Sequence, residues 1–279
     1  MIKIAVPNKG RMFQSTISLL NNSGFKLQDF EERKLYVETN YDGVNLLFIR
    51  TQDIGPYVQS NVADVGITGY DLVIENRLSV EKILDLNYGF CRLVLAGPAG
   101  KKLKDGVRIA TKYQNITSDY LKNLRVNGKI VTSSGALEIQ PRLGLADFIV
   151  DLTSTGSTLK MNDLVVYDEL LQSNAVLIAN RKSIKKKSEE ITEIKLAIES
   201  VILAENKSYM MFNISKDNLP QIIDKMPCMR APTIVQTGDD RIVAVQTVVP
   251  KNDISKTINW LKRFGALDIL VLDVKRVIL

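Results

Sequence analysis

Histidine is absent from the 279-residue sequence. This absence excludes a Ser-His-Asp triad, a Cys-His pair, a histidine general base and histidine metal ligands. Cysteine is scarce, because only Cys91 and Cys228 are present and they lie far apart in sequence, so neither a disulfide framework nor a zinc site is expected. Any chemistry must therefore use carboxylates, lysine, arginine, hydroxyls, backbone amides and a bound cation.

Long apolar runs are also missing, since none approaches the ~20 residues needed to cross a bilayer. Residues 1–7 lack the basic region, long apolar stretch and cleavage site of a secretion signal, so we expect a cytoplasmic protein with no membrane partner. The net charge of +6 would suit nucleic acid, a membrane or a phosphorylated small molecule. Its densest cluster, at residues 181–187, is typical of a solvated loop, and no nucleic-acid partner is expected.

Up to about residue 205, short apolar runs alternate with amphipathic stretches, which is typical of an α/β architecture. Strand-like runs cover residues 2–6, 44–49, 64–67, 91–96, 107–110, 129–131, 148–152 and 175–179. Helical patterns cover residues 116–124, 136–143 and 190–203. The order of these runs predicts two lobes, with residues 1–89 and 175–205 in the first and residues 90–174 in the second.

The pattern changes after residue 205. Strands are expected at residues 209–214, 233–237, 242–248 and 269–274, with helices at 219–226 and 254–264. The order βαββαβ within about 70 residues is that of a ferredoxin-like module. Residues 206–279 are therefore predicted to form a separate α+β domain.

The segment 151–159 carries a run of hydroxyl side chains directly after a predicted strand. Thr153, Ser154, Thr155, Ser157 and Thr158 surround Gly156. Backbone amides and hydroxyls at such a turn suit a phosphate group, and glycine lets the backbone approach it closely. The alternative is a turn whose hydroxyls only cap the next helix. In open α/β sheets, however, ligands bind at the carboxyl ends of the strands.

Cations follow two other predicted strands. Lys9 and Arg11 flank a glycine after the first strand, and Arg50 follows the strand 44–49. Cations at such an edge suit a polyphosphate. The alternative for Arg50 is a surface ion pair with Asp53.

Two more groups of polar residues are candidates for ligand binding. The segment Thr68-Gly69-Tyr70-Asp71 is suited to close approach of a planar or hydroxylated ligand, or else to a tight turn in which Asp71 caps a helix. Glu138 and Asp151 could orient a sugar or hold Mg²⁺, or could serve as capping or ion-pairing residues.

The segments 4–11 (IAVPNKGR), 48–54 (FIRTQDI) and 64–72 (DVGITGYDL) are together similar, in order and spacing, to ATP phosphoribosyltransferases. The similarity continues through residues 108–113, 135–138, 143–147, 151–159, 231–234 and 264–266. It covers essentially the whole chain and indicates the long form of the family. The fold implied is α/β: a two-lobed, periplasmic-binding-protein-like (type II) catalytic core followed by a ferredoxin-like (ACT-like) regulatory domain.

Members of this family join ATP to phosphoribosyl pyrophosphate (PRPP), releasing pyrophosphate, in the committed step of histidine biosynthesis. The resemblance implies that Thr153, Ser154, Thr155, Gly156, Ser157 and Thr158 bind the 5′-phosphate of PRPP, with Asp151 near the ribose. It places Lys9, Arg11, Arg50, Thr68, Gly69 and Asp71 in the nucleotide and pyrophosphate regions. No residue is assigned a chemical step; the positioning candidates are Lys9, Arg50 and Glu138.

The cofactor implied is Mg²⁺, held by Asp151 and Glu138 or mainly by substrate phosphates. Leu152 follows Asp151, whereas purine-salvage phosphoribosyltransferases place two acidic residues before their loop, so a mechanism shared with that group is not expected.

Long-form members bind histidine as an inhibitor in the C-terminal domain and exchange between a dimer and a hexamer. Met229, Ala231 and Thr233 match the stretch that lines that pocket. The alternative is a domain that only assembles subunits. Two rival functions are a solute-binding protein, which would need a signal or an anchor, and an amino-acid-sensing module, which would leave the cationic and hydroxyl-rich loops unexplained.

Overall fold

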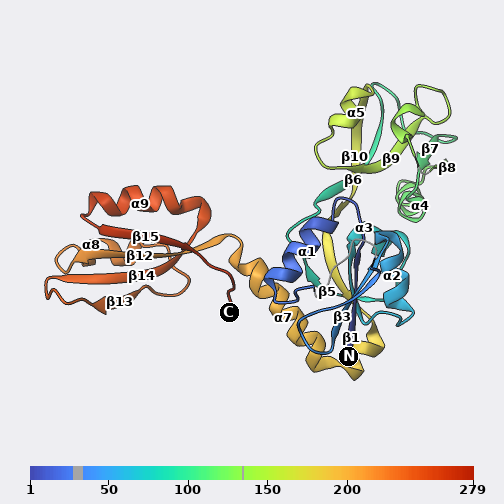
Figure 1. Ribbon diagram of the computed structural model, residues 1–279. Coiled ribbons are helices and arrows are strands. Elements are labelled where there is room, and N and C mark those ends of the chain that lie inside the picture. The colour runs from blue at the N-terminus through green and yellow to red at the C-terminus, as the bar shows by residue number, and fades with distance from the viewer. Residues whose placement is uncertain (28–33, 134) are drawn as a thin grey trace. The chain divides into compact units, whose positions relative to one another are not determined.

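The computed structural model describes residues 1–27, 34–133 and 135–279. The chain divides into two compact units, residues 1–195 and 196–279, and each is described here by itself. Figure 1 shows the first unit as two α/β lobes, each built on its own sheet. Among the described residues, no helix combines the length and apolar character that a membrane span requires.

Lobe I is built on a six-stranded sheet with the order β2-β3-β1-β4-β11-β5. Its strands are β1 (Ile2–Pro7), β2 (Tyr36–Glu38), β3 (Val44–Ile49), β4 (Val65–Gly69), β5 (Glu81–Asp85) and β11 (Ala175–Ala179). Strand β1 runs parallel to β3 and β4, whereas β11 is antiparallel to both β4 and β5. Every residue of β4 and β11 is buried, which explains why Thr68 is the one polar residue in these two strands.

Three helices follow the parallel strands of lobe I, and two follow β11. They are α1 (Phe13–Asn22), α2 (Thr51–Gln59), α3 (Tyr70–Glu75), α6 (Arg181–Lys186) and α7 (Ser188–Ala204), the last of which continues into the second unit. Because α1, α2 and α3 each begin within a few residues of a strand's carboxyl end, the loops between them gather at one edge of the sheet.

A buried carboxylate fixes the segment between α6 and α7 to the lobe I sheet. Both oxygens of Asp64 lie 2.9 Å from Lys187 Nζ, while Ser183 donates its hydroxyl proton to Oδ1 at 2.6 Å. The Lys3 N–H of β1 donates to Oδ2 at 3.0 Å. Burial alone would raise the pKa of Asp64, but the hydrogen bonds from Ser183 and Lys187 and from the Lys3 N–H outweigh it and hold that pKa below its usual value.

Lobe II is built on a five-stranded sheet with the order β10-β6-β9-β7-β8. Its strands are β6 (Cys91–Pro98), β7 (Arg108–Thr111), β8 (Lys129–Thr132), β9 (Phe148–Thr153) and β10 (Leu164–Ser173), and its helices are α4 (Gln114–Asn123) and α5 (Ser157–Met161). The apolar residues of β6, β7 and β9 form the centre of its core. The two-lobed, periplasmic-binding-protein-like core expected from the sequence is confirmed.

The helix expected at residues 136–143 is wrong. Only a single 3₁₀ turn, η1 (Leu137–Ile139), forms, and it is followed by further turns. Pro141 has no N–H to donate to the Leu137 carbonyl, which accepts instead from the Gln140 N–H at 3.0 Å. Ala136 has φ +47°, which is incompatible with an α-helix at that end.

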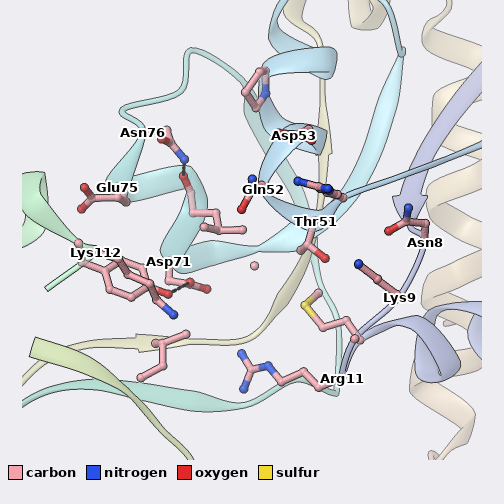
Figure 2. Close-up of a pocket in the computed structure, with 18 residues that line it drawn as sticks. Asn8, Lys9, Arg11, Thr51, Gln52, Asp53, Asp71, Glu75, Asn76 and Lys112 are labelled. Carbon is pink, nitrogen blue, oxygen red and sulfur yellow. Dashed lines mark hydrogen bonds between the residues drawn. The ribbon is translucent and has the colours of Figure 1, made fainter. Parts of the chain in front are cut away.

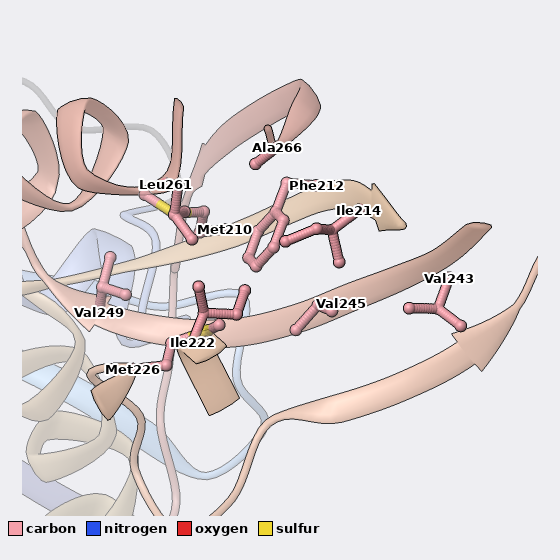
Figure 3. Close-up of a cluster of buried hydrophobic side chains, with 10 residues drawn as sticks. All are labelled: Met210, Phe212, Ile214, Ile222, Met226, Val243, Val245, Val249, Leu261 and Ala266. Carbon is pink, nitrogen blue, oxygen red and sulfur yellow. The ribbon is translucent and has the colours of Figure 1, made fainter. Parts of the chain in front are cut away.

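The second unit contains a four-stranded antiparallel sheet with the order β13-β14-β12-β15. Its elements are β12 (Lys207–Ser215), α8 (Leu219–Ile222), β13 (Thr233–Gln236), β14 (Ile242–Pro250), α9 (Ile254–Arg263) and β15 (Leu267–Asp273). The helix expected at 219–226 is shorter than predicted, because α8 ends at Ile222 and continues as the 3₁₀ turn η2 (Ile223–Lys225). Alternate residues of β12 and β14 are buried, as a sheet covered on one face requires. Phe212, Val245, Ile222 and Leu261 meet in this core (Figure 3), and the ferredoxin-like module is confirmed.

Candidate active site

A pocket of about 760 Å³ lies at the carboxyl edge of the lobe I sheet and reaches lobe II (Figure 2). The turn after β1 and the helices α2 and α3, which follow β3 and β4, supply most of its wall, and lobe II adds Lys112, Tyr113 and Leu152. The lobe I wall consists of Asn8, Lys9, Gly10, Arg11, Met12, Arg50, Thr51, Gln52, Asp53, Pro56, Gly69, Asp71, Leu72, Glu75 and Asn76. The pocket therefore has cations on one side and both lobes in its wall.

A smaller cavity of about 230 Å³ lies in lobe II beside the end of β9. It is lined by Glu138, Asp151, Leu152, Thr153, Ser154, Thr155, Gly156, Ser157, Thr158 and Leu159. Leu152 lines both cavities, so the two are neighbours. The structure thus brings the hydroxyl-rich loop close to the cationic pocket.

The three predicted cations all line the larger pocket. Lys9 and Arg11 come from the turn between β1 and α1, and Arg50 directly precedes α2; all three are exposed. Arg11 donates to Cys91 Sγ at 3.1 Å and so contacts the first residue of lobe II strand β6. Among the ion pairs of the described residues there is none between Arg50 and Asp53, which leaves the Arg50 guanidinium available to an anion.

Asp71 lies where the two lobes meet. It is only 3% exposed, and its oxygens accept hydrogen bonds from Tyr113 Oη at 2.8 Å and from Ser173 Oγ at 2.7 Å. Its own N–H donates to Ser173 Oγ at 2.9 Å. Burial, and then the charge of Asp71, raise the pKa of Tyr113, so the phenol stays protonated and keeps donating. Asp71 therefore joins lobe I to two residues of lobe II.

Gly69 and Thr68 support this contact in different ways. A Cβ on residue 69 would collide with Oδ1 of Asp71, so only glycine fits beside the carboxylate. Thr68 is fully buried, donates its hydroxyl proton to the Thr51 carbonyl at 3.1 Å, and is not part of the pocket wall. Thr68 thus supports the turn that begins α2, and its contact with the nucleotide stays a prediction.

The hydroxyl-rich loop is shaped by its own hydrogen bonds. Thr153 Oγ1 accepts from the Gly156 N–H at 2.9 Å, and the hydroxyls of Thr155 and Ser157 lie 3.0 Å apart. Gly156 has φ +78°, a conformation that favours glycine. The side chains of Ser154, Thr155, Ser157 and Thr158 are exposed. The loop is thus a folded cradle with hydroxyls available to a ligand.

Asp151 and Glu138 face the smaller cavity together. Asp151 Oδ1 accepts from the Leu152 N–H at 2.8 Å and lies 3.6 Å from Lys112 Nζ. Burial raises the pKa of Asp151 while Lys112 lowers it, and the negative charge of Glu138 raises it further. Among the described residues, no group of three or more His, Cys, Asp or Glu side chains lies close enough together to hold a metal ion. These two carboxylates are the oxygen donors that Mg²⁺ prefers, and the remaining ligands would have to be substrate oxygens and water.

Sequence reasoning gave no role to Lys112, Tyr113, Ser173 or Glu75. Lys112 could have been predicted from its position, because it directly follows a strand of lobe II just as Arg50 directly follows β3. The other three act through contacts between segments far apart in sequence, for which the sequence alone has no local pattern.

The three predicted allosteric residues lie in the second unit. All three are exposed: Met229 and Ala231 precede β13, and Thr233 is its first residue. The start of the segment that leads into β13 is held to the sheet, because Thr247 donates its hydroxyl proton to the Pro227 carbonyl at 3.0 Å.

Comparison with known proteins identifies similar chains over the whole length. The family model of ATP phosphoribosyltransferase (HisG) matches residues 50–200, and that of the HisG C-terminal domain matches residues 204–276. The ATP phosphoribosyltransferase of Methanothermobacter thermautotrophicus is 42% identical over 284 residues and covers 99% of both chains. That of Methanocaldococcus jannaschii is 40% identical and covers 100% of both.

A solved structure, the ATP phosphoribosyl transferase (HisG:HisZ) complex from Thermotoga maritima, matches with a TM-score of 0.64. The sequences are 31% identical, and the match covers 71% of this chain and 99% of that one.

Proposed function

Because the chain belongs to the ATP phosphoribosyltransferase family, in its long form with a C-terminal domain, we propose that its two neighbouring cavities bind ATP and PRPP. The reaction is the transfer of the phosphoribosyl group to ATP with release of pyrophosphate, the first step of histidine biosynthesis. The observation that carries this proposal is that a cation-lined pocket and a hydroxyl-lined one share Leu152 in their walls.

PRPP binds in the smaller cavity. Thr153–Thr158 hold the 5′-phosphate through backbone amides and the exposed hydroxyls of residues 154, 155, 157 and 158, since a phosphate dianion needs several converging donors. Asp151 lines the same cavity, where it orients the ribose hydroxyls.

ATP and the departing pyrophosphate occupy the larger pocket. Lys9, Arg11 and Arg50 bind their phosphates, and Gly69 and Asp71 form the wall beside the nucleotide. Both carboxylate oxygens of Asp71 already accept hydrogen bonds from lobe II. Asp71 therefore shapes the pocket wall and holds the two lobes together, rather than accepting a hydrogen bond from the nucleotide.

The chemistry is a substitution at the anomeric carbon of PRPP. A ring nitrogen of the purine forms the new C–N bond, the C–O bond to pyrophosphate breaks, and the bonding electrons leave with the pyrophosphate oxygen. The ring nitrogen has its own lone pair, so no general base is needed, which agrees with the absence of histidine. Lys9 and Arg50 position the reactants and offset the negative charge of their phosphates, and Glu138 helps to position them.

Mg²⁺ would be held by Asp151 and Glu138 together with substrate phosphates, and when bound it supplies positive charge against the leaving pyrophosphate. The residues of the chain bring the two reactants into line. Lys112, 3.6 Å from Asp151, offsets the negative charge that this carboxylate would otherwise present to PRPP.

The direct test is formation of phosphoribosyl-ATP from ATP and PRPP by the purified protein, followed by absorbance, with Mg²⁺ present and then removed by a chelator. Turnover that needs both substrates and the metal supports the proposal. Ligand binding without turnover would instead favour a binding protein.

Regulation by histidine is part of the proposal. Met229, Ala231 and Thr233 are exposed beside β13, where a free amino acid could reach them, and binding there would favour a less active hexamer over a dimer. Millimolar histidine should lower the rate, and Ala231→Arg should abolish this effect while leaving the uninhibited rate unchanged. An unchanged rate in unmodified protein at millimolar histidine would refute this part alone.

We also propose the lobe boundaries at residues 1–89 with 175–205 and 90–174, and the regulatory domain at 206–279. A cytoplasmic location, without nucleic-acid or membrane partners, stays a prediction.

A further inference from the structure

Helix α4 of lobe II has no cap of its own. The first N–H groups of an α-helix lack partners within the helix and are usually satisfied by a short polar side chain at the N-cap position. That position is occupied by Tyr113, whose side chain makes no such bond and donates instead to Asp71. The partners of the α4 amides must therefore come from elsewhere.

Glu75, the last residue of α3 in lobe I, supplies these partners. Its Oε1 accepts from the Asn115 N–H and its Oε2 from the Ile116 N–H, each at 3.0 Å. The Glu75 carbonyl accepts from Asn115 Nδ2 at 2.8 Å. A carboxylate opposite the positive end of α4 is also favoured by the helix dipole. A side chain of one lobe thus completes a helix of the other.

The two ends of α3 hold the same stretch of lobe II. Asp71 and Glu75 are four residues apart, so they lie on one face of the helix. Asp71 accepts from Tyr113, and Glu75 accepts from the next turn, at residues 115 and 116. Figure 2 shows Asp71 and Glu75 on α3, with Lys112 beside Asp71.

The stretch held in this way includes Lys112, which lines the larger pocket and faces Asp151 of the smaller one at 3.6 Å. Glu75 itself is part of the wall of the larger pocket and not of the smaller one. We propose that Glu75 is a positioning residue. By capping α4 from lobe I, it fixes Lys112 against Asp151, so that the geometry of the PRPP cavity depends on the contact with lobe I, whose residues bind the nucleotide. This inference rests on the proposed function.

The chain offers a matched control. Arg77, two residues beyond Glu75, also contacts α4, donating to both oxygens of Asp119 at 3.0 and 3.1 Å. Its side chain is 59% exposed and that of Asp119 is 53% exposed. Exposed ion pairs of this kind contribute little. Arg77→Gln therefore removes a contact between the lobes without uncapping α4.

The experiment compares full-length Glu75→Ala with Arg77→Gln in the absence of substrate. Hydrogen exchange over residues 114–123 should be at least fivefold faster in Glu75→Ala and unchanged in Arg77→Gln. Calorimetry with PRPP alone should show at least fivefold weaker binding for Glu75→Ala, although Glu75 does not line that cavity, and a change below twofold for Arg77→Gln. Unchanged exchange or unchanged PRPP affinity in Glu75→Ala would overturn the inference.

A second variant separates positioning from simple stabilisation of the helix. Glu75→Ala/Gln114→Glu places a carboxylate at the first position of α4 from within lobe II. It should recover the thermal stability of the protein but not the PRPP affinity, because the connection to lobe I is still missing. Full recovery of affinity would show that Glu75 is only a helix cap. If the unmodified protein neither binds PRPP nor turns over, the proposed function fails, and the exchange rates alone decide whether Glu75 holds α4.

Discussion

The left-handed backbone at Gly156 makes a quantitative prediction possible. With φ +78°, this residue lets the loop close through the Thr153 Oγ1 contact to its N–H. An alanine in this conformation costs about 1–2 kcal/mol. The surrounding loop is exposed, and a Cβ on residue 156 meets nothing within 4 Å, so the ligand-free loop can relax into other conformations. PRPP must then restore the bound form, and its affinity should fall by about 5- to 30-fold.

Stability should change far less than affinity. Alanine also reduces the freedom of the unfolded chain, which returns about 0.4–1 kcal/mol. The melting temperature of Gly156→Ala should therefore fall by no more than about 4 °C. Gly156→Val adds a branched side chain where the phosphate is placed, and PRPP binding should be lost with the fold intact.

Gly100 provides the matched control for this measurement. It has φ +77°, also meets nothing within 4 Å, and lies outside both cavities. Gly100→Ala should show the same small loss of stability with PRPP affinity within twofold of the unmodified protein. Calorimetry and thermal unfolding of the three variants decide the matter: the reasoning is refuted if Gly156→Ala binds PRPP normally, or if Gly100→Ala weakens binding equally.

Two further predictions concern Asp64 and Asp151, whose pKa values are shifted in opposite directions. Asp64→Asn should lower the free energy of unfolding at pH 7 by about 2–4 kcal/mol, somewhat less than the loss of one partner of a fully buried ion pair. Because the pKa of Asp64 is lowered in the folded state, the loss should be complete above the unfolded pKa of ~3.9. It should disappear as the pH falls through the folded pKa, and urea unfolding at several pH values measures both. Asp151→Asn should leave the protein as stable or more stable at pH 7 while weakening PRPP binding, because burial raises the pKa of Asp151 and its ionised form opposes folding. Any gain in melting temperature should vanish below pH ~3.9, where the carboxyl is protonated in both states. A large loss of stability at pH 7 would contradict the assignment.

The sequence predicted those parts of the fold in which local pattern and tertiary environment agree. The buried strand Ala175–Ala179 has the predicted bounds, since an apolar run between polar turns has few other solutions. The prediction of a helix at 136–143 was wrong because Pro141 has no N–H and so removes one helical hydrogen bond. The spacing of apolar residues contains no information about that loss. Strand β10 gave no signal, because most of its residues are exposed and its pairing with β6 has two register shifts.

The site was predictable to the extent that its residues follow strand ends. Lys9, Arg50 and the 153–158 loop line the two cavities for that reason. Thr68 has the same sequence context, yet its side chain points into the lobe toward the Thr51 carbonyl, and no local pattern distinguishes these two directions. Tyr113 became visible only in three dimensions, because its partner Asp71 is 42 residues away.

The position of β11 also affects how the chain is made. This strand lies between β4 and β5 and pairs with both, although more than 80 residues separate it from either. On the ribosome, lobe II has all of its strands once Ser173 has emerged, whereas lobe I still lacks a central strand. Nascent β4 and β5 therefore present open edges that can pair wrongly until β11 arrives. Lobe II should be the first part to acquire native structure during synthesis, and chaperones should bind the unfinished N-terminal sheet.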